Sequence, residues 1–388
     1  MKIVIKILLL LGLLLTAVNA QEQINAMKVP GNVGKIGPES KAWFSTAYID
    51  VILYPQTTNI TFDDKESMLD EKAKRVRVKA LHDGNNISFL IEWKDSTKNT
   101  PEGCCSKVSV DGFALQFPVV YNDVTKLPYI NMGNKDRAVV VHLRKAAEED
   151  YEPNGFQVLD KYYDTFQKPV KGHEKTDYSR VFIMEGFRSM TESKNDNTSS
   201  AMDMVYKDGV WKGTLSRPLK SEYLDLKNAA FPVSFITWDG NSSSSDSVEY
   251  LSSWIGVKLL AEQGGDELLD TLKSEINGDI YNGKNLAIEN CAACHNFAES
   301  TMAPSHMAPN LSNVGGYSTA QYLMESITDP NAVVVTNYKP NIKLGFPWYN
   351  LDEDGNLKST MPSYEWMDEK SREDLIAYLK TLKAESRM

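Results

Sequence analysis

Two cysteines and a histidine near the C-terminus have the types and spacing that point most directly to chemistry. They form Cys291-Ala-Ala-Cys294-His295. Two thiols at this spacing can add to the vinyl groups of a haem, and the adjacent imidazole can then bind the iron. Thioredoxin-like redox pairs and halves of zinc sites share the spacing, but this chain lacks a surrounding βαβ pattern and a second Cys/His pair. The motif therefore predicts a covalently attached haem c with His295 as an axial ligand.

A second axial ligand is expected from a methionine further along the chain, since methionine commonly completes the coordination of haem c. Met361 lies in Ser359-Thr360-Met361-Pro362, just before the last predicted helix, and the proline stiffens its loop. Other methionines lie very close to the attachment motif or within predicted helices: Met302, Met307, Met324 and Met367. We expect Met361 to be the ligand.

The segment Pro309-Asn310-Leu311 follows the histidine and can act on it indirectly. A backbone carbonyl such as that of Pro309 can accept the second ring N–H of His295 and fix its tautomer; the proline could also simply stiffen the loop. The order of these motifs, ending in Asp374-Leu-Ile-Ala-Tyr-Leu379, resembles a class I cytochrome c across about residues 280–382.

The elements that must position these residues fall into two classes. Short strand-like runs separated by turns extend to about Lys258, and they favour an antiparallel β-sandwich. Helical patterns follow at Asp266–Ile276, Asp279–Asn290, Thr319–Thr328 and Asp368–Ala384. The predicted fold is a mainly β N-terminal domain joined to an all-α cytochrome c domain.

The N-terminal segment predicts where the protein is located, and the net charge limits what it binds. Residues 1–20 have a basic start, a short apolar run and a small-residue site near Ala20, which predicts a cleaved secretory signal and a periplasmic protein. We expect domains at 21–260 and 279–388, with a helical linker at 261–278 and no membrane span in the mature chain. The net charge of −10 argues against nucleic acid as a partner.

Several N-terminal segments together carry a further resemblance. They are Lys79–Gly84, Glu92–Thr97, Asp111–Pro118, Asn131-Met132-Gly133, Glu185-Gly-Phe187, Lys207–Trp211 and Thr237–Gly240. In this order they resemble the haem-b-binding γ subunits of periplasmic molybdenum enzymes of the dimethyl sulfoxide reductase family, which serve ethylbenzene, dimethyl sulfide, selenate, chlorate and nitrite or nitrate enzymes. The resemblance covers most of residues 40–258.

The resemblance implies a second, non-covalent haem b whose iron is bound by a methionine and a lysine. Met132 matches the methionine position, and Lys207 lies in the region of the lysine. Strand alternation places Met204 on the face opposite Lys207, so Met204 is a rival ligand, and Lys212 is a third option. A lysine that binds iron must be neutral, which requires burial or the metal to lower its pKa.

These expectations predict a dihaem electron-transfer subunit rather than an enzyme. Its partners would be the iron–sulfur and molybdenum subunits of a periplasmic oxidoreductase, of nitrite oxidoreductase or nitrate reductase type by analogy, and a soluble or membrane cytochrome. An alternative is a surface- or carbohydrate-binding sandwich that carries one haem c. An enzyme with an open iron position, such as a peroxidase, is disfavoured by Met361.

Cys104 and Cys105 are the two cysteines that haem attachment does not use. They could form a vicinal disulfide, pair with another chain or stay free, and the sequence does not decide among these states.

Overall fold

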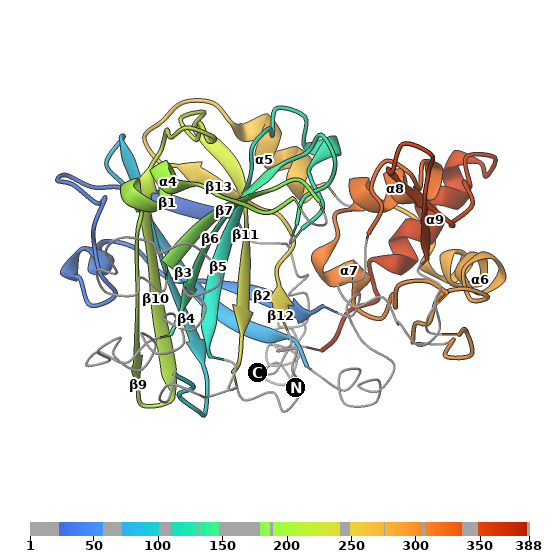
Figure 1. Ribbon diagram of the computed structural model, residues 1–388, viewed down its shortest axis with the longest axis horizontal. Coiled ribbons are helices and arrows are strands. Elements are labelled where there is room, and N and C mark those ends of the chain that lie inside the picture. The colour runs from blue at the N-terminus through green and yellow to red at the C-terminus, as the bar shows by residue number, and fades with distance from the viewer. Residues whose placement is uncertain are drawn as a thin grey trace, which may run out of the picture.

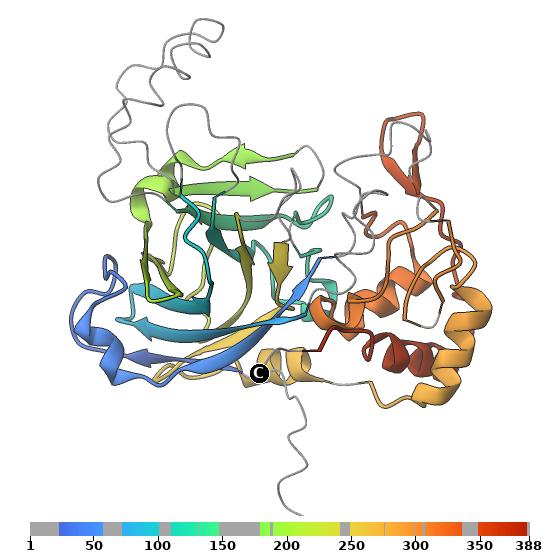
Figure 2. The same ribbon diagram turned by 90° about the horizontal axis from the view of Figure 1, so that it is seen from below.

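A β body (residues 23–259) and a helical body (residues 280–385) lie side by side in the computed structural model (Figures 1 and 2). The structure describes residues 23–56, 72–100, 110–130, 132–146, 179–186, 189–240, 249–274, 276–298, 300–304, 307–335 and 348–385. The expected signal segment, residues 1–20, and the pair Cys104 and Cys105 lie outside these ranges.

The β body is one long sheet that folds back on itself. Its strands follow the order β8-β7-β6-β5-β11-β12-β2-β3-β4-β10-β9, and β1 and β13 lie off this path. The strand bounds are β1 Ile24–Lys28, β2 Ile49–Pro55, β3 Lys74–His82, β4 Asn86–Lys94, β5 Gly112–Pro118, β6 Val139–Lys145, β7 Ser179–Met184, β8 Thr191–Glu192, β9 Ala201–Lys207, β10 Val210–Pro218, β11 Ala230–Trp238, β12 Glu249–Leu251 and β13 Ile255–Leu259.

Aromatic contacts show that the two halves of the sheet pack face to face. Phe89 on β4 meets Phe117 on β5 and Phe235 on β11, with ring centroids 6.2 and 6.1 Å apart. β4 forms no ladder with β5 or β11, so these rings meet across the layers. The predicted sandwich is confirmed, and its core is built from strands whose buried residues are large and apolar.

Two ladders depart from a purely antiparallel arrangement. β1 pairs in parallel with both β13 and β3, with Ile24 opposite Val257 and Met27 opposite Leu81. Because these partners are far apart in sequence, no local turn signal predicts the pairing.

Two tight turns join neighbouring antiparallel strands, β3 to β4 and β9 to β10. The Asp83 side chain accepts hydrogen bonds from the backbone N–H groups of Asn85 and Asn86, and Gly84 takes a positive φ of 90°. Asp208 and Gly209 both have positive φ angles and join β9 to β10, the geometry that suits a two-residue hairpin turn.

The four predicted helices begin where the sequence indicates, and two of them also end there. Side chains of Asp279, Thr319 and Asp368 cap the first turns of α6 (Ile280–Asn290), α8 (Ala320–Thr328) and α9 (Glu369–Leu379). α9 ends at Leu379, earlier than the predicted Ala384. Shorter elements are η1 Lys41–Ser45, η2 Val124–Lys126, α4 Lys194–Ser199 and α7 Val314–Tyr317, and a small hairpin pairs β14 Tyr349–Leu351 with β15 Leu357–Ser359.

The segment expected as a linker contains α5 (Asp266–Lys273), which packs on the β body. Leu269 and Leu272 are buried, and a Cβ built on Gly256 of β13 would lie 2.4 Å from Leu269 Cδ2. Lys258 of β13 forms an ion pair with Asp266 at 2.9 Å. None of the helices in the described ranges is both long and apolar enough to cross a membrane.

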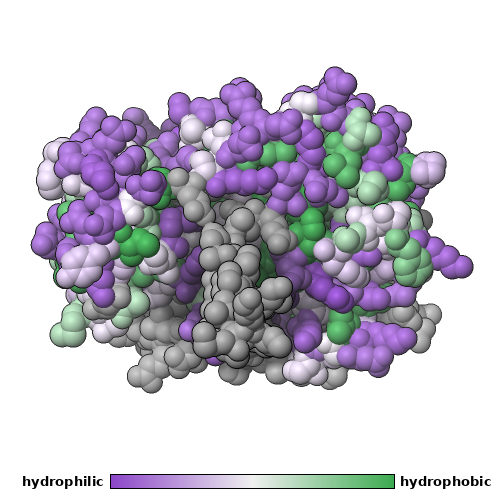
Figure 3. Space-filling model, turned by 180° about the vertical axis from the view of Figure 1, so that it is seen from behind, coloured by the Kyte–Doolittle hydropathy of each residue, from purple (hydrophilic) through white to green (hydrophobic). Residues whose placement is uncertain are grey.

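Tryptophans of the β body are buried rather than arrayed on its surface. Those in the described ranges are no more than 8 % exposed: Trp43, Trp93, Trp211, Trp238 and Trp254. They therefore do not form the exposed aromatic row that a sugar-binding module would use. The face seen in Figure 3 is mostly hydrophilic, with hydrophobic residues in small scattered groups.

A close crossing of α6 and α9 holds the helical body together. A Cβ built on Gly283 would lie 1.9 Å from the backbone oxygen of Asp374 and 2.9 Å from Tyr378 Cβ. The Asp374 carboxylate accepts from Asp279 N–H at 2.7 Å, from Asn282 at 2.9 Å and from Lys370. Its pKa is lowered to about 2, first by the hydrogen bond from Lys370, so it contributes stability above about pH 4 that is lost as the pH falls toward 2.

Gly283→Ala should destabilise the helical body by about 3 kcal/mol, because the added methyl group meets backbone that cannot rotate away. Urea unfolding followed by helical circular dichroism measures the change. Gly37→Ala is the control, since a Cβ there would meet only Asp203 Oδ2 at 3.6 Å. Equal stability of the two variants would contradict the close crossing.

Candidate haem site

The cysteine–histidine motif forms a tight turn that continues α6. The N–H of Cys291 donates to Ala287 O at 2.8 Å, and those of Cys294 and His295 donate back to Cys291 O at 3.1 and 2.9 Å. Cys291 is partly buried and Cys294 is exposed, and neither forms a disulfide. The turn therefore holds two thiols and an imidazole on one short piece of backbone.

The imidazole of His295 is oriented by a backbone carbonyl. His295 Nδ1 lies 2.7 Å from Pro309 O, which leaves Nε2 as the nitrogen that can bind a metal. Burial lowers the pKa of His295, and this favours the neutral imidazole that metal binding requires. The Pro309 loop is itself held, since Leu311 N–H donates to Asn296 O at 2.8 Å.

His295 opens onto an apolar cavity of about 200 Å³. Besides Cys291, Cys294 and His295, its lining includes Leu323 and Ile327 of α8, Leu375 and Leu379 of α9, and Trp348, Met361 and Tyr364. An apolar chamber that brings together two thiols, an imidazole and a thioether suits a covalently attached haem. The four predicted haem c residues thus share one site.

Met361 reaches this cavity from a loop that is tied at several points. Met361 N–H donates to Ser359 Oγ at 3.1 Å, and the preceding Thr360 donates to Trp348 O through both its N–H and its hydroxyl. Trp348 Nε1 in turn donates to Val335 O at 2.7 Å. The loop is thereby positioned before any ligand bond forms. No local sequence pattern indicates this role of Trp348.

Met307 lines the same cavity and is the remaining rival as a ligand. It lies two residues before Pro309, whose carbonyl contacts His295, and it is 43 % exposed. Met302 is 91 % exposed and Met367 is buried elsewhere, and neither lines the cavity. Met361 is therefore the better candidate for the second ligand that a haem iron would take.

The β body contributes one wall of the cavity through Tyr129. Its ring lies 5.6 Å from that of Tyr322 on α8, centroid to centroid. Tyr129 belongs to a docking loop (residues 129–137, of which 131 is not described) that precedes β6. Nothing in the local sequence marked this residue, since its role depends on how the two bodies meet.

Polar contacts fix the docking loop on the helical body. Arg137 donates two hydrogen bonds to the Glu325 carboxylate, at 2.6 and 2.7 Å, and both side chains are about one-fifth exposed. Lys135 donates to Asn356 at 2.9 Å, and Asn134 donates to Ala332 O at 3.4 Å. A bidentate, mostly buried arginine–carboxylate pair is among the stronger charged contacts.

Met132 lies within the docking loop and is 8 % exposed. Its carbonyl accepts from Gly186 N–H at 2.9 Å. A Cβ on the neighbouring Gly133 would lie 3.4 Å from Val139 N at the start of β6. Val139 pairs with Pro118, the last residue of β5. Met132 is therefore at the end of the β body that meets the helical body.

Lys207 lies at the opposite end of the β body. It is exposed on the β9–β10 turn, and its neighbour Tyr206 donates to Asp95 O at 3.1 Å. Asp95 lies beside Asp111, which precedes β5. The seven residues of β5 span about 20 Å. The structure thus does not bring Lys207 and Met132 together, and the two side chains do not fit a single iron in this arrangement.

The two other candidate ligands of a haem b iron, Met204 and Lys212, are also placed by the structure. Met204 is buried opposite Gly213, and the space that this glycine leaves is filled by the ring of Phe113, whose Cε1 would lie 2.5 Å from a Cβ there. Lys212 points outward and pairs with Glu39 at 3.3 Å. Strand alternation correctly placed Met204 inside and Lys207 outside.

Arg137→Ala should loosen the docking of the two bodies, because Glu325 would lose both of its hydrogen bonds to the guanidinium. We expect hydrogen exchange to rise about tenfold in α8 and the docking loop, with global stability changed by about 2 kcal/mol or less. Arg180→Ala is the control, since its pair with Glu192 spans 3.4 Å and is exposed. Unchanged exchange in α8 would show that the pair does not hold the interface.

Two family models match the chain, one for each body. The model described as ethylbenzene dehydrogenase matches residues 23–248, and the model described as cytochrome c matches residues 280–383. Both resemblances expected from the sequence are confirmed. Together the matches support an electron-transfer chain with covalently bound haem c.

Known structures and curated proteins add little beyond these matches. The chain is similar to a family 9 carbohydrate-binding module from Caldicellulosiruptor kristjanssonii in complex with cellotriose (10 % identity, 62 % of this chain and 95 % of that one, TM-score 0.34). It is also similar to a putative carbohydrate-binding protein from Bacteroides uniformis (8 % identity, 61 % of this chain and 98 % of that one, TM-score 0.34). Scores this low carry no argument about function. No curated protein matches the chain.

Proposed function

The chain belongs to the ethylbenzene dehydrogenase family, and we propose that it is an exported, periplasmic electron-transfer subunit of a molybdenum oxidoreductase complex. Cys291 and Cys294 would attach haem c, and His295 and Met361 would bind its iron. The haem supplies one-electron chemistry, while the protein sets its ligands, burial and surroundings. The chain would pass electrons between the iron–sulfur and molybdenum subunits and a cytochrome partner.

One observation carries this proposal: the docking loop joins the family-matched β body to the wall of the haem c cavity. Tyr129 of that loop lines the cavity, and Arg137 fixes the loop to α8. A partner bound to the β body is thereby held close to the haem c site by a fixed contact and not only by a tether. Such a contact keeps the bound partner at a high effective concentration near the haem c site.

The haem b that the family resemblance implies would use Met132 as one ligand. This residue is buried in the docking loop, three residues from Tyr129. Lys207 does not share a site with it in this structure, so the proposal assigns no second ligand and no electron path through a b haem.

Met361→His should lower the reduction potential of the c haem by on the order of 0.1–0.3 V, since a thioether ligand favours reduced iron and axial ligands set potentials over about 0.8 V. Redox titration of the purified, haem-loaded protein measures the shift. Met307→Leu is the matched control and should leave the potential unchanged. A shift in the Met307→Leu protein instead would make Met307 the ligand.

Met132→Ala tests the b haem. In protein exported from a host that matures c-type cytochromes, a pyridine haemochrome spectrum before and after acid-acetone extraction should show one retained c haem and one extractable b haem per chain. Met132→Ala should remove only the extractable haem, whereas Lys207→Ala should retain it. If wild-type protein carries a c haem alone, the expected b haem is absent and the β body acts only as a docking module.

A further inference from the structure

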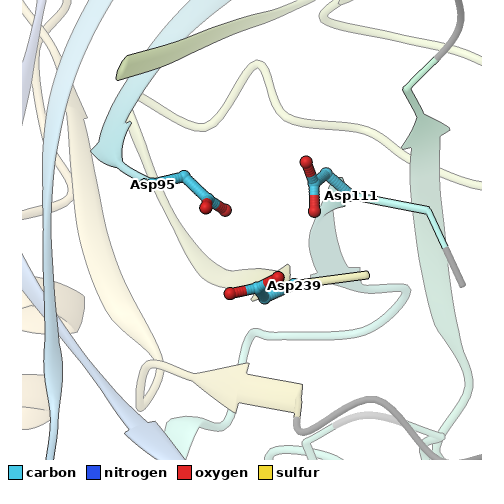
Figure 4. Close-up of side chains that lie close together, drawn as sticks. All are labelled: Asp95, Asp111 and Asp239. Atoms are coloured by element: carbon cyan, nitrogen blue, oxygen red, sulfur yellow. The ribbon is translucent and has the colours of Figure 1, made fainter. Parts of the chain in front are cut away.

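Three aspartates converge at the end of the β body that lies away from the helical body. Asp95 directly follows β4, Asp111 directly precedes β5, and Asp239 directly follows β11. β5 and β11 are paired in the ladder with Gly112 opposite Trp238, which brings the last two aspartates together. One carboxylate oxygen from each residue lies within 4.8 Å of the others, and Figure 4 shows the side chains pointing toward a common centre.

One oxygen in this cluster is buried without a partner. Asp95 is 7 % exposed, and its Oδ1 accepts from the N–H and hydroxyl of Thr97, whereas its Oδ2 has no hydrogen-bond partner among the described residues. Leaving a buried carboxylate oxygen unpaired is costly. Because the Asp95 carboxylate faces Asp111 and Asp239, this oxygen is available to a ligand at the centre of the cluster.

The Asp111 carboxylate is held rigidly while it keeps room for another bond. Its Oδ1 accepts from Gly240 N–H at 2.8 Å, and its Oδ2 accepts from Asn99 N–H at 2.7 Å and from Trp211 Nε1 at 3.0 Å. Each carboxylate oxygen has two acceptor positions, so Oδ1 retains one. The three donors fix the direction in which Asp111 presents its negative charge.

The cluster concentrates negative charge in a poorly solvated place. Burial raises the pKa of Asp111 to about 6, and it also raises the pKa of Asp95, with the charge of Asp239 acting in the same direction. Neither Asp95 nor Asp111 forms an ion pair with a described lysine or arginine. A bound cation would offset the free-energy cost of holding these carboxylates ionised together.

We propose that Asp95, Asp111 and Asp239 form a binding site for a divalent cation, Ca²⁺ in preference to Mg²⁺. Three carboxylates offer the hard oxygen ligands that both ions take. Mg²⁺ keeps several of its waters and demands near-octahedral geometry, whereas Ca²⁺ accepts more protein oxygens in irregular arrangements. A cluster of two buried aspartates and one partly buried aspartate at three strand ends, with a backbone turn at Thr97 beside it, suits the larger ion.

The site joins the two layers of the sandwich. β4 belongs to one layer, and β5 and β11 belong to the other. A cation shared by Asp95, Asp111 and Asp239 therefore links the end of β4 to the paired ends of β5 and β11, with which β4 forms no ladder. Its role is structural, because the cluster lies at the far end of β5 from the docking loop.

Calcium titration of the haem-loaded, full-length protein tests the proposal after treatment with EDTA. Isothermal titration calorimetry should show one Ca²⁺ site per chain, and thermal unfolding should shift upward by about 5 °C at Ca²⁺ concentrations near 100 times the dissociation constant, with a smaller shift in Mg²⁺. Absence of both binding and the thermal shift would overturn the proposal.

Asp95→Asn is the decisive variant, since it keeps the shape of the side chain and removes the charge of the unpartnered oxygen. In EDTA it should unfold at or above the wild-type temperature, and in Ca²⁺ it should bind at least tenfold more weakly and lose the shift. Asp270→Asn, on the exposed side of α5, is the control and should respond as the wild type does. An undiminished response in Asp95→Asn would place the calcium elsewhere and overturn the proposal.

Discussion

The contact between the docking loop and α8 is the interaction on which the rest of the arrangement depends. Arg137 and Glu325 are 188 residues apart in sequence, yet their paired hydrogen bonds place Tyr129 in the wall of the haem c cavity. Without that contact the cavity would lose the part of its wall that Tyr129 forms, and the two bodies would meet mainly where Asn313 donates to Pro55 O. With it, the family-matched β body and the haem c site form a continuous structure, and Met132 lies at the junction.

Within the helical body, the position of the haem-binding turn depends on backbone packing. Gly283 allows α6 to lie against the backbone of α9, and Asp374 ties the start of α6 to α9 through Asp279 and Asn282. α6 ends directly before Cys291, so the crossing sets the direction in which the two thiols and His295 face. The Met361 loop, which lines the same cavity, is held separately by Trp348.

Features encoded by neighbouring residues were predictable from the sequence. The caps at Asp279, Thr319 and Asp368, the hairpin at Asp83–Asn86 and the alternation that buries Met204 all follow from local patterns. The parallel pairing of β1, the wall residue Tyr129 and the end of the sandwich at which Lys207 lies depend on contacts between distant segments, which local patterns do not specify. The attachment motif at Cys291–His295 could be predicted because its signature is local, whereas a non-covalent haem site is assembled from separate loops.

The two ends of the β body are suited to different tasks because β5 runs between them. At one end, the docking loop places tyrosine and arginine side chains against the helical body. At the other, three carboxylates gather where β4, β5 and β11 begin or end. Strand ends in a sandwich fray first, since their ladders stop and solvent enters. A charge-neutralising link at the far end would hold the layers in register along β5, so the docking loop at its near end would rest on a rigid support.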